Sequence, residues 1–277
     1  SLVGSEMCIR DRIVLGPTLI KFLSNIQFSQ SIRRDGPESH QVKSGTPTMG
    51  GLIIISSLIV STLLWSDFKN PYIWILIFIT ISFSVIGFLD DWLKIKEKNS
   101  KGLSSWTKIS YQILFASIIS IALYFYIFES FELTYIVPFF KEVSLSLGLL
   151  FIPISVFIIV GSSNAVNLTD GLDGLAILPV ILITAALGLI AWAAGNTIVS
   201  DYLYIPYIDG TGELLVICGA LIGSGIGFLW FNAYPAQIFM GDVGSLSMGA
   251  FIALIAIVVR HEIVFAVMSM VFIMEAM

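Results

Sequence analysis

Long apolar stretches alternate with short polar segments along almost the whole chain. Seven stretches are complete candidates for transmembrane helices, because a helix needs about 20 mostly apolar residues to cross a bilayer. They cover residues 49–66, 71–89, 109–128, 145–162, 175–194, 213–231 and 243–259. Membrane-barrel strands would instead alternate apolar and polar residues over about ten positions. The pattern therefore predicts an all-α fold, a polytopic transmembrane helix bundle.

Both ends of the chain carry incomplete apolar stretches. Residues 13–24 resemble the exit of a first span, and residues 263–277 end without a polar flank, as a partial later span would. Residues 1–12 lack an initiator Met and match neither a signal peptide nor a helix, so we interpret them as a cloning or sequence-assembly scar. We expect one transmembrane domain over residues 13–277, truncated at both ends.

The composition agrees with a membrane protein. Hydrophobic residues make up 57% of the chain and charged residues 12%, whereas about 25% is usual for charged residues in soluble domains. This balance excludes a disordered tail and a nucleic-acid binder with a basic patch. The two cysteines, Cys8 and Cys218, are too few for a secreted disulfide scaffold.

Threading the candidate spans through a bilayer divides the loops into two sets. One set comprises residues 25–48, 90–108, 163–174 and 232–242, and the other comprises residues 67–70, 129–144, 195–212 and 260–262. With Lys21 at its boundary, the first side carries nine lysines and arginines and the second carries three. Cytoplasmic loops carry the excess of positive charge in membrane proteins, so we expect the first set to face the cytoplasm.

Four polar segments that look too specific to be plain connectors all fall on this cytoplasmic side. They are KSGTPTMGG (43–51), GFLDDWLK (87–94), NAVNLTDGLDG (164–174) and FNAYPAQIFMGDVGS (231–245). A transport path would need polar groups in the middle of the bilayer. Polar segments gathered at span ends are instead typical of a membrane enzyme with its active site at the surface.

Asp90 and Asp91 end an apolar span, where the helix dipole disfavours negative charge. A nearby cation or a proton must therefore compensate the pair. Neighbouring residues point about 100° apart on a helix, so we expect unequal roles, one carboxylate facing the reaction centre and the other binding or supporting a metal. The alternative is a solvated pair neutralised by Lys94, Lys96 and Lys98.

Asn167, Asp170 and Asp173 are spaced by three, which keeps them along one face of a helical turn. Gly171 and Gly174 would let a ligand approach the backbone closely. The alternative is an Asx turn and helix cap that opens the span over 175–194.

Asp242 lies just before an apolar helix, where it could act as an N-cap or hold Mg²⁺ between phosphates. Phe239 could stack on a base or be an interface aromatic. Lys43 and Thr48 offer a cation and a hydroxyl for a phosphate. Rich in aspartate and lysine and poor in nucleophile motifs, the sequence suits Mg²⁺-dependent phosphoryl chemistry on a substrate reached from the bilayer.

Together with DGPESH (35–40), these four segments resemble the phospho-N-acetylmuramoyl-pentapeptide transferase family, within the polyprenyl-phosphate N-acetylhexosamine-1-phosphate transferases. The resemblance runs from about residue 13 to the end of the chain. It implies ten spans in the bacterial inner membrane and Mg²⁺ as cofactor. It also implies transfer of phospho-MurNAc-pentapeptide from UDP-MurNAc-pentapeptide to undecaprenyl phosphate, giving lipid I and UMP.

The resemblance also assigns roles to residues. It implies that Asp90, Asp91 and Asp242 are catalytic, with Asp242 binding the metal. Positions associated with substrate or nucleoside binding correspond to Lys43, Thr48, Lys94, Asn167, Asp170, Asp173, Asn232 and Phe239. Most of the first span, the last span and the family's His-rich cytoplasmic loop have no counterpart in this sequence.

Two other functions compete with this one. A sister enzyme would transfer a HexNAc-1-phosphate from UDP to the same lipid, and the NLTDGLDG and GTPTMGG segments favour the pentapeptide enzyme over it. An ion-coupled transporter would need carboxylates deep in its spans, and the seven complete candidates have none in their apolar centres. The sequence leaves the oligomeric state open, with a homodimer among the options.

Overall fold

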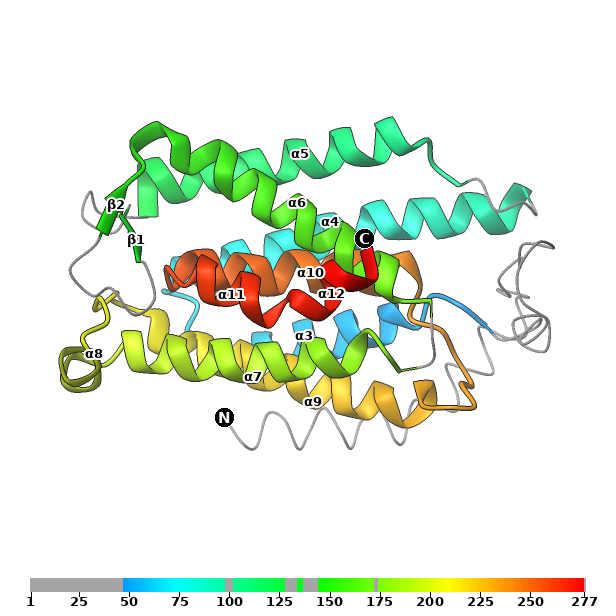
Figure 1. The fold of residues 1–277 in the computed structure, drawn as a ribbon. Helices are drawn as coiled ribbons and strands as arrows, with labels where there is room; N and C mark the ends of the chain where they lie inside the picture. The colour runs from blue at the N-terminus through cyan, green and yellow to red at the C-terminus, as the bar shows by residue number, and fades with distance from the viewer. Residues whose placement is uncertain (1–46, 98–101, 128–133, 137–143, 172–173, 277) are drawn as a thin grey trace.

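The computed structural model describes residues 47–97, 102–127, 134–136, 144–171 and 174–276 (Figure 1). Its long helices are α3 (Gly51–Trp65), α4 (Pro71–Glu97), α5 (Ser105–Ala122), α6 (Phe151–Thr169), α7 (Ile177–Ala194), α9 (Leu214–Asn232) and α10 (Gly241–Val258). Shorter helices are α8 (Thr197–Leu203), α11 (Glu262–Met268) and α12 (Met270–Ala276). A small antiparallel hairpin pairs β1 (Thr134–Ile136) with β2 (Ser144–Ser146).

The predicted membrane helix bundle is confirmed. Six helices, counted with the short turns that extend them, are long and apolar enough to cross a bilayer, and α3 is a shorter apolar helix. Each of the seven complete candidate spans corresponds to one of these helices. The partial first span over residues 13–24 lies outside the described residues.

Helix α10 lies in the middle of the bundle, between the layer of α4 and α6 and the layer of α3, α7 and α9 (Figure 1). Every residue from Val243 to Val258 is buried. Close approach to its neighbours depends on small residues. A Cβ on Gly51 of α3 would lie 2.2 Å from the backbone nitrogen of Gly244, and one on Gly249 would lie 2.6 Å from the carbonyl oxygen of Ser162 in α6.

Polar side chains of α6 strengthen the contact with α10. The hydroxyl of Ser162 donates to the carbonyl of Gly249 at 2.8 Å, and that of Ser163 donates to the carbonyl of Leu246 at 2.9 Å. Because no water is present in a bilayer core to satisfy them, such hydroxyls stabilise a bundle when they bond across helices.

Several helix boundaries differ from the predicted ones. Helix α4 continues to Glu97 rather than ending near residue 89, and α6 extends to Thr169 rather than to residue 162. The apolar run over 263–277 is divided at Ser269 into α11 and α12, so it is not one continuous helix. Apolar length marks the lipid-spanning part of a helix, but a helix can continue into polar sequence wherever the bundle compensates its charges.

The end of the bundle that carries the β1–β2 hairpin also carries α8 (Figure 1). Helix α8 and strand β1 lie in segments expected to be loops, whereas β2 overlaps the first residues of the candidate span over 145–162. The aspartates and the ends of α4, α6 and α9 lie at the opposite end.

Candidate active site

A glycine contact brings α4 and α10 together where the acidic residues lie. A Cβ on Gly87 would come within 2.2 Å of the backbone carbonyl oxygen of Asp242, so the first turn of α10 rests directly on α4. Asp90 and Asp91 follow one turn later. As a result, one carboxylate oxygen from each of Asp90, Asp91 and Asp242 lies within 4.8 Å of the other two.

Two lysines neutralise this cluster. The ammonium of Lys94 lies 2.5 Å from Asp90 Oδ2, 3.1 Å from Asp242 Oδ2 and 3.7 Å from Asp91 Oδ1. The ammonium of Lys108, in the first turn of α5, lies 2.6 Å from Asp242 Oδ2 and 3.9 Å from Asp90 Oδ2. Opposite charges at these distances offset the desolvation of the buried Asp90 and Asp91 carboxylates and of the partly buried Asp242.

Asp90 and Asp91 are 3% and 5% exposed, so the solvated-pair interpretation is wrong. The position expected for them at a helix end is also wrong, because α4 continues to Glu97. Lys94, one turn later on the same helix, compensates both carboxylates. Helix α4 can therefore continue past the two aspartates.

The two neighbouring carboxylates have different partners. The amide of Leu103 donates to Asp90 Oδ1 at 2.8 Å, whereas the amide of Val243 donates to Asp91 Oδ2 at 3.3 Å. Their divergence on the helix thus gives them separate backbone donors. It does not separate them from the common cluster, since both reach Asp242.

Asn167 connects α6 to the cluster. Its side-chain amide donates to Asp242 Oδ1 and to the hydroxyl of Ser245, both at 2.8 Å. The Ser245 hydroxyl in turn donates to the carbonyl of Gly241 at 3.0 Å. Asp242 therefore has one oxygen facing the two lysines and the other held by Asn167.

Asp170 follows the last residue of α6 and accepts a hydrogen bond from the backbone amide of Gly241. Burial, with the nearby negative charges of Asp242 and Asp91, raises the pKa of this carboxyl well above its usual value. Asn167 and Asp170 both reach the α10 terminus, although α6 ends at Thr169 between them. Asp173 lies outside the described residues.

The alternatives based on helix caps do not hold. Met240 occupies the N-cap of α10, and Asp242 is the second residue of that helix, so Asp242 is not an N-cap. The N-cap of α7 is Ala176, which makes no side-chain hydrogen bond. A capping role for Asp170 at α7 is therefore not supported.

Thr48 reaches the cluster because its loop is joined to the loop before α10. The amide of Phe239 donates to the carbonyl of Pro47 at 2.9 Å, and the amides of Gly50 and Gly51 donate to the carbonyls of Phe239 and Met240 at 2.9 and 2.8 Å. Lys43, in the same predicted motif, lies outside the described residues.

Gly241 fits where these two loops meet the aspartates. Its φ of 73° is a left-handed conformation that favours glycine, and a Cβ there would lie 2.6 Å from Asp91 Oδ2 and 2.9 Å from the Thr48 hydroxyl. The Thr48 hydroxyl and the Asp91 carboxylate thus face the same small space.

Asn232 holds the loop that carries Phe239. Its side-chain oxygen accepts from the amide of Gly174 at 3.0 Å, and its side-chain nitrogen donates to the carbonyl of Ile238 at 2.9 Å. Asn232 is buried and Phe239 is half-buried. The side-chain amide of Asn232 is therefore hydrogen-bonded to the backbone of two segments, at Gly174 and at Ile238.

Lys108 and Ser245 belong to this site although sequence reasoning did not select them. Lys108 is one of the positive charges of the segment over 90–108, and Ser245 is the last residue of the segment over 231–245. A signal existed for Ser245, because it lies three residues after Asp242 and hence on a similar face of α10. Lys108 is brought to the cluster by the packing of α5, which no local pattern indicates.

The donor set fits a hard divalent cation. Carboxylate oxygens are ligands that Mg²⁺ prefers, and three of them converge here. The ammonium groups of Lys94 and Lys108 beside them can donate hydrogen bonds to the oxygens of a phosphate. The site therefore has the components to hold a cation and a phosphorylated substrate together.

Comparison with known proteins gives two matches. The model of glycosyl transferase family 4 matches residues 73–260. A second model, phospho-N-acetylmuramoyl-pentapeptide-transferase signature 1, matches residues 43–55. The first match includes the three aspartates and both lysines, and the second includes Thr48.

Proposed function

The chain belongs to glycosyl transferase family 4 and is a polyprenyl-phosphate sugar-phosphate transferase, and from this premise we propose its substrates. We infer that it transfers phospho-MurNAc-pentapeptide from UDP-MurNAc-pentapeptide to undecaprenyl phosphate, releasing UMP and forming lipid I. The observation that carries the proposal is the backbone pairing of the signature loop at Pro47–Gly51 with the residues that precede Asp242.

The reaction exchanges one phosphoanhydride bond for another. An oxygen of the lipid phosphate attacks the β-phosphorus of the UDP-sugar, the bond between the α- and β-phosphates breaks, and UMP leaves with the bridging oxygen. Lys94 and Lys108 hold the negative charge of the diphosphate. Asp90 or Asp91 accepts the proton of the lipid phosphate, which keeps the attacking oxygen anionic.

Asp242, with Asp90 and Asp91 beside it, would hold Mg²⁺. When bound, the cation neutralises charge on the diphosphate and so favours departure of UMP. Asn167 fixes the orientation of Asp242 for this task, since it holds the carboxylate oxygen that the lysines do not contact.

The remaining residues hold the substrates. Thr48 and Lys43 contact phosphate, and Phe239 stacks on the uracil base. Asp170 and Asp173 bind the nucleoside side of the substrate. Asn232 acts through the loop that it holds, because its amide is occupied by backbone contacts.

A comparison of sugar donors tests the proposal. Membranes containing the protein are incubated with undecaprenyl phosphate, Mg²⁺ and either UDP-MurNAc-pentapeptide or UDP-GlcNAc, and released UMP is measured. We expect UMP release with UDP-MurNAc-pentapeptide and not with UDP-GlcNAc. Membranes that contain Asp242→Asn should release none with either donor. Release only with UDP-GlcNAc would instead identify the sister HexNAc-1-phosphate transferase.

A further inference from the structure

Helix α8 lies at the end of the bundle opposite the aspartates and is oriented differently from the spans. Figure 1 shows it nearly end-on, whereas the long helices run across the page, so its axis lies across theirs. Asn196 fixes its start, with Oδ1 accepting from the amides of Ile198 and Val199 at 3.0 and 3.1 Å. A capped helix across the ends of spanning helices is placed to lie in the plane of a membrane surface.

The two faces of α8 differ in exposure. Ser200 is 2% exposed and faces the protein, whereas Ile198 and Tyr202 are each 80% exposed and Leu203 is 46% exposed. Tyr204, directly after the helix, is 75% exposed. A short helix that turns large apolar and tyrosine side chains away from its own protein fits the membrane interface, where aromatic rings of this kind concentrate.

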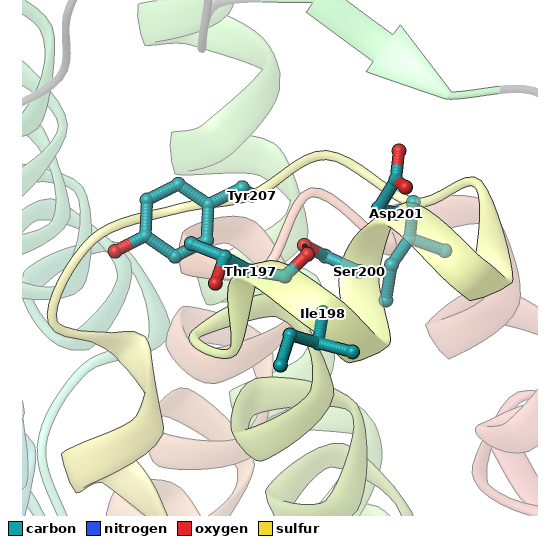
Figure 2. A pocket seen from close by; sticks show the side chains of 6 residues that line it. Thr197, Ile198, Ser200, Asp201 and Tyr207 are labelled. Carbon is teal, nitrogen blue, oxygen red and sulfur yellow. Dashed lines mark hydrogen bonds between the residues drawn. The ribbon is translucent and has the colours of Figure 1, made fainter.

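A shallow hollow lies beside this helix and is lined by Thr197, Ile198, Ser200, Asp201, Ile205 and Tyr207 (Figure 2). Its polar groups are hydroxyls and a carboxylate. The Tyr207 hydroxyl donates to Asp209 Oδ1 at 3.0 Å at the protein surface.

Charge at this end of the bundle favours one kind of lipid surface. Among the described residues around α8, exposed carboxylates belong to Asp67, Asp201, Asp209 and Glu213, while Lys69 supplies an exposed ammonium. The nearby Arg260 is 1% exposed and lies 3.4 Å from Glu262, so its charge is directed inward. An excess of carboxylates disfavours contact with anionic headgroups and is compatible with headgroups that carry an ammonium group.

We propose that α8 is an in-plane anchor that seats Ile198, Tyr202 and Leu203 in the headgroup layer of the leaflet opposite the active site. Its partner is a zwitterionic phospholipid surface of the phosphatidylethanolamine type, in preference to an anionic one of the phosphatidylglycerol type. The apolar side chains enter the boundary between headgroups and acyl chains, and Asp201 and Asp209 remain among the headgroup amines.

Depth-dependent quenching tests the seating. Ile198→Cys, Tyr202→Cys and, as a control on the same surface, Asp209→Cys are labelled with an environment-sensitive fluorophore in the full chain, with the unsubstituted protein as background for Cys8 and Cys218. In proteoliposomes, we expect lipids with a nitroxide at a shallow acyl position to quench the fluorescence of labels at 198 and 202. Aqueous iodide should quench these labels weakly. The label at 209 should respond mainly to iodide.

Two outcomes would overturn the proposal. Iodide access at 198 and 202 equal to that at 209 would show that α8 faces water. Protection from both quenchers, with disulfide cross-linking between copies of Ile198→Cys, would show that a second copy of the chain covers this face.

Headgroup preference is tested separately by melting temperature in vesicles of phosphatidylethanolamine or phosphatidylglycerol mixed with phosphatidylcholine. We expect a higher melting temperature with phosphatidylethanolamine. The double variant Asp201→Asn/Asp209→Asn should narrow that difference, and Lys69→Gln should widen it. Equal melting temperatures of the unsubstituted protein in the two lipids would contradict the preference.

Discussion

At the scale of single residues, the site is governed by the compensation of buried charge. Asp90, Asp91 and Asp242 would repel one another in water-poor surroundings, and Lys94 and Lys108 hold them together. Removing one partner of such a buried set normally destabilises a protein, because the other charge is left uncompensated. Here three carboxylates share two ammonium groups, so the loss of one carboxylate leaves two of each.

That balance leads to a prediction for Asp242→Asn. The variant should fold with a melting temperature close to that of the unsubstituted protein, because two carboxylates then face two ammonium groups. Turnover should fall by about 10²-fold or more, because a principal electrostatic group of the reaction is lost. UMP release and thermal unfolding are measured on the same preparation, with Asp209→Asn at the opposite end as the control. Substantial UMP release by Asp242→Asn would remove this residue from the metal site.

The paired aspartates should not be equivalent. Asp90 accepts from Leu103 and lies 2.5 Å from Lys94, whereas Asp91 accepts from Val243 at the start of α10. We therefore expect Asp90→Asn and Asp91→Asn to differ in residual turnover or in the Mg²⁺ concentration for half-maximal rate. Identical losses with superimposable Mg²⁺ titrations would mean that both simply bind the cation.

At the scale of elements, the glycine contact between α4 and α10 sets the spacing of the site. We expect Gly87→Ala to cost about 1–3 kcal/mol of stability, because its methyl group would overlap the backbone of Asp242 and force the helices apart. It should also reduce turnover by displacing the carboxylates from one another.

Gly161→Ala in α6 is the matched control for that prediction. A Cβ there meets no atom within 4 Å, so the change should be neutral or stabilise the helix by up to about 1 kcal/mol. Unfolding midpoints in detergent and initial rates of UMP release compare the two variants. Similar behaviour of both would show that α4 tolerates a larger separation from α10.

The helices themselves could be predicted from sequence because lipid imposes a simple rule of length and apolarity. Their ends could not. Whether α4 continues past Asp90 depends on Lys94 and on Asp242 from a distant helix, and α6 continues through Asn167 because that side chain is bonded to α10. Helix α8 has only seven residues, too few to stand out as an apolar run.

The candidate site was predictable to the extent that its residues lie in distinctive motifs. Asp90, Asp91, Asp242, Lys94, Asn167, Asp170 and Thr48 all reach the same end of the bundle. Lys108 could not be selected, because a lysine in an amphipathic stretch looks the same whether it faces solvent or a buried carboxylate. The backbone role of Asn232 likewise depends on Gly174 and Ile238, which are distant or unremarkable in sequence.

At the scale of the whole molecule, the asymmetry of loop charge predicts one orientation in the membrane, with the site facing the cytoplasm. We expect a membrane-impermeant maleimide to label Asp209→Cys on intact cells but not Gln237→Cys, which lies in an exposed position near the site. Inverted membrane vesicles should give the reverse pattern. Labelling of Gln237→Cys on intact cells would place the site on the outer face.

Binding of a cation at the junction of α4 and α10 should stabilise the whole bundle. A ligand at about 100 times its dissociation constant adds about 2.7 kcal/mol to the free energy of unfolding, if it binds only the folded state. We expect Mg²⁺ to raise the melting temperature of the unsubstituted protein and to leave Asp242→Asn unchanged, with K⁺ at equal ionic strength as the control. A rise of equal size in both proteins would point to a cation bound elsewhere.

The central position of α10 has a consequence for how the protein is made. Helices α3, α4, α6 and α7 precede it along the chain, yet they pack on α10, which is synthesised after them. Until α10 is inserted, these helices lack the central helix on which they pack. Ser162, Ser163 and Asn167 then lack the hydrogen-bond partners that α10 later provides. Insertion of this one helix closes the bundle and assembles the aspartate cluster in the same event. A chain that still lacks α10 therefore also lacks Asp242, and its aspartate cluster is incomplete.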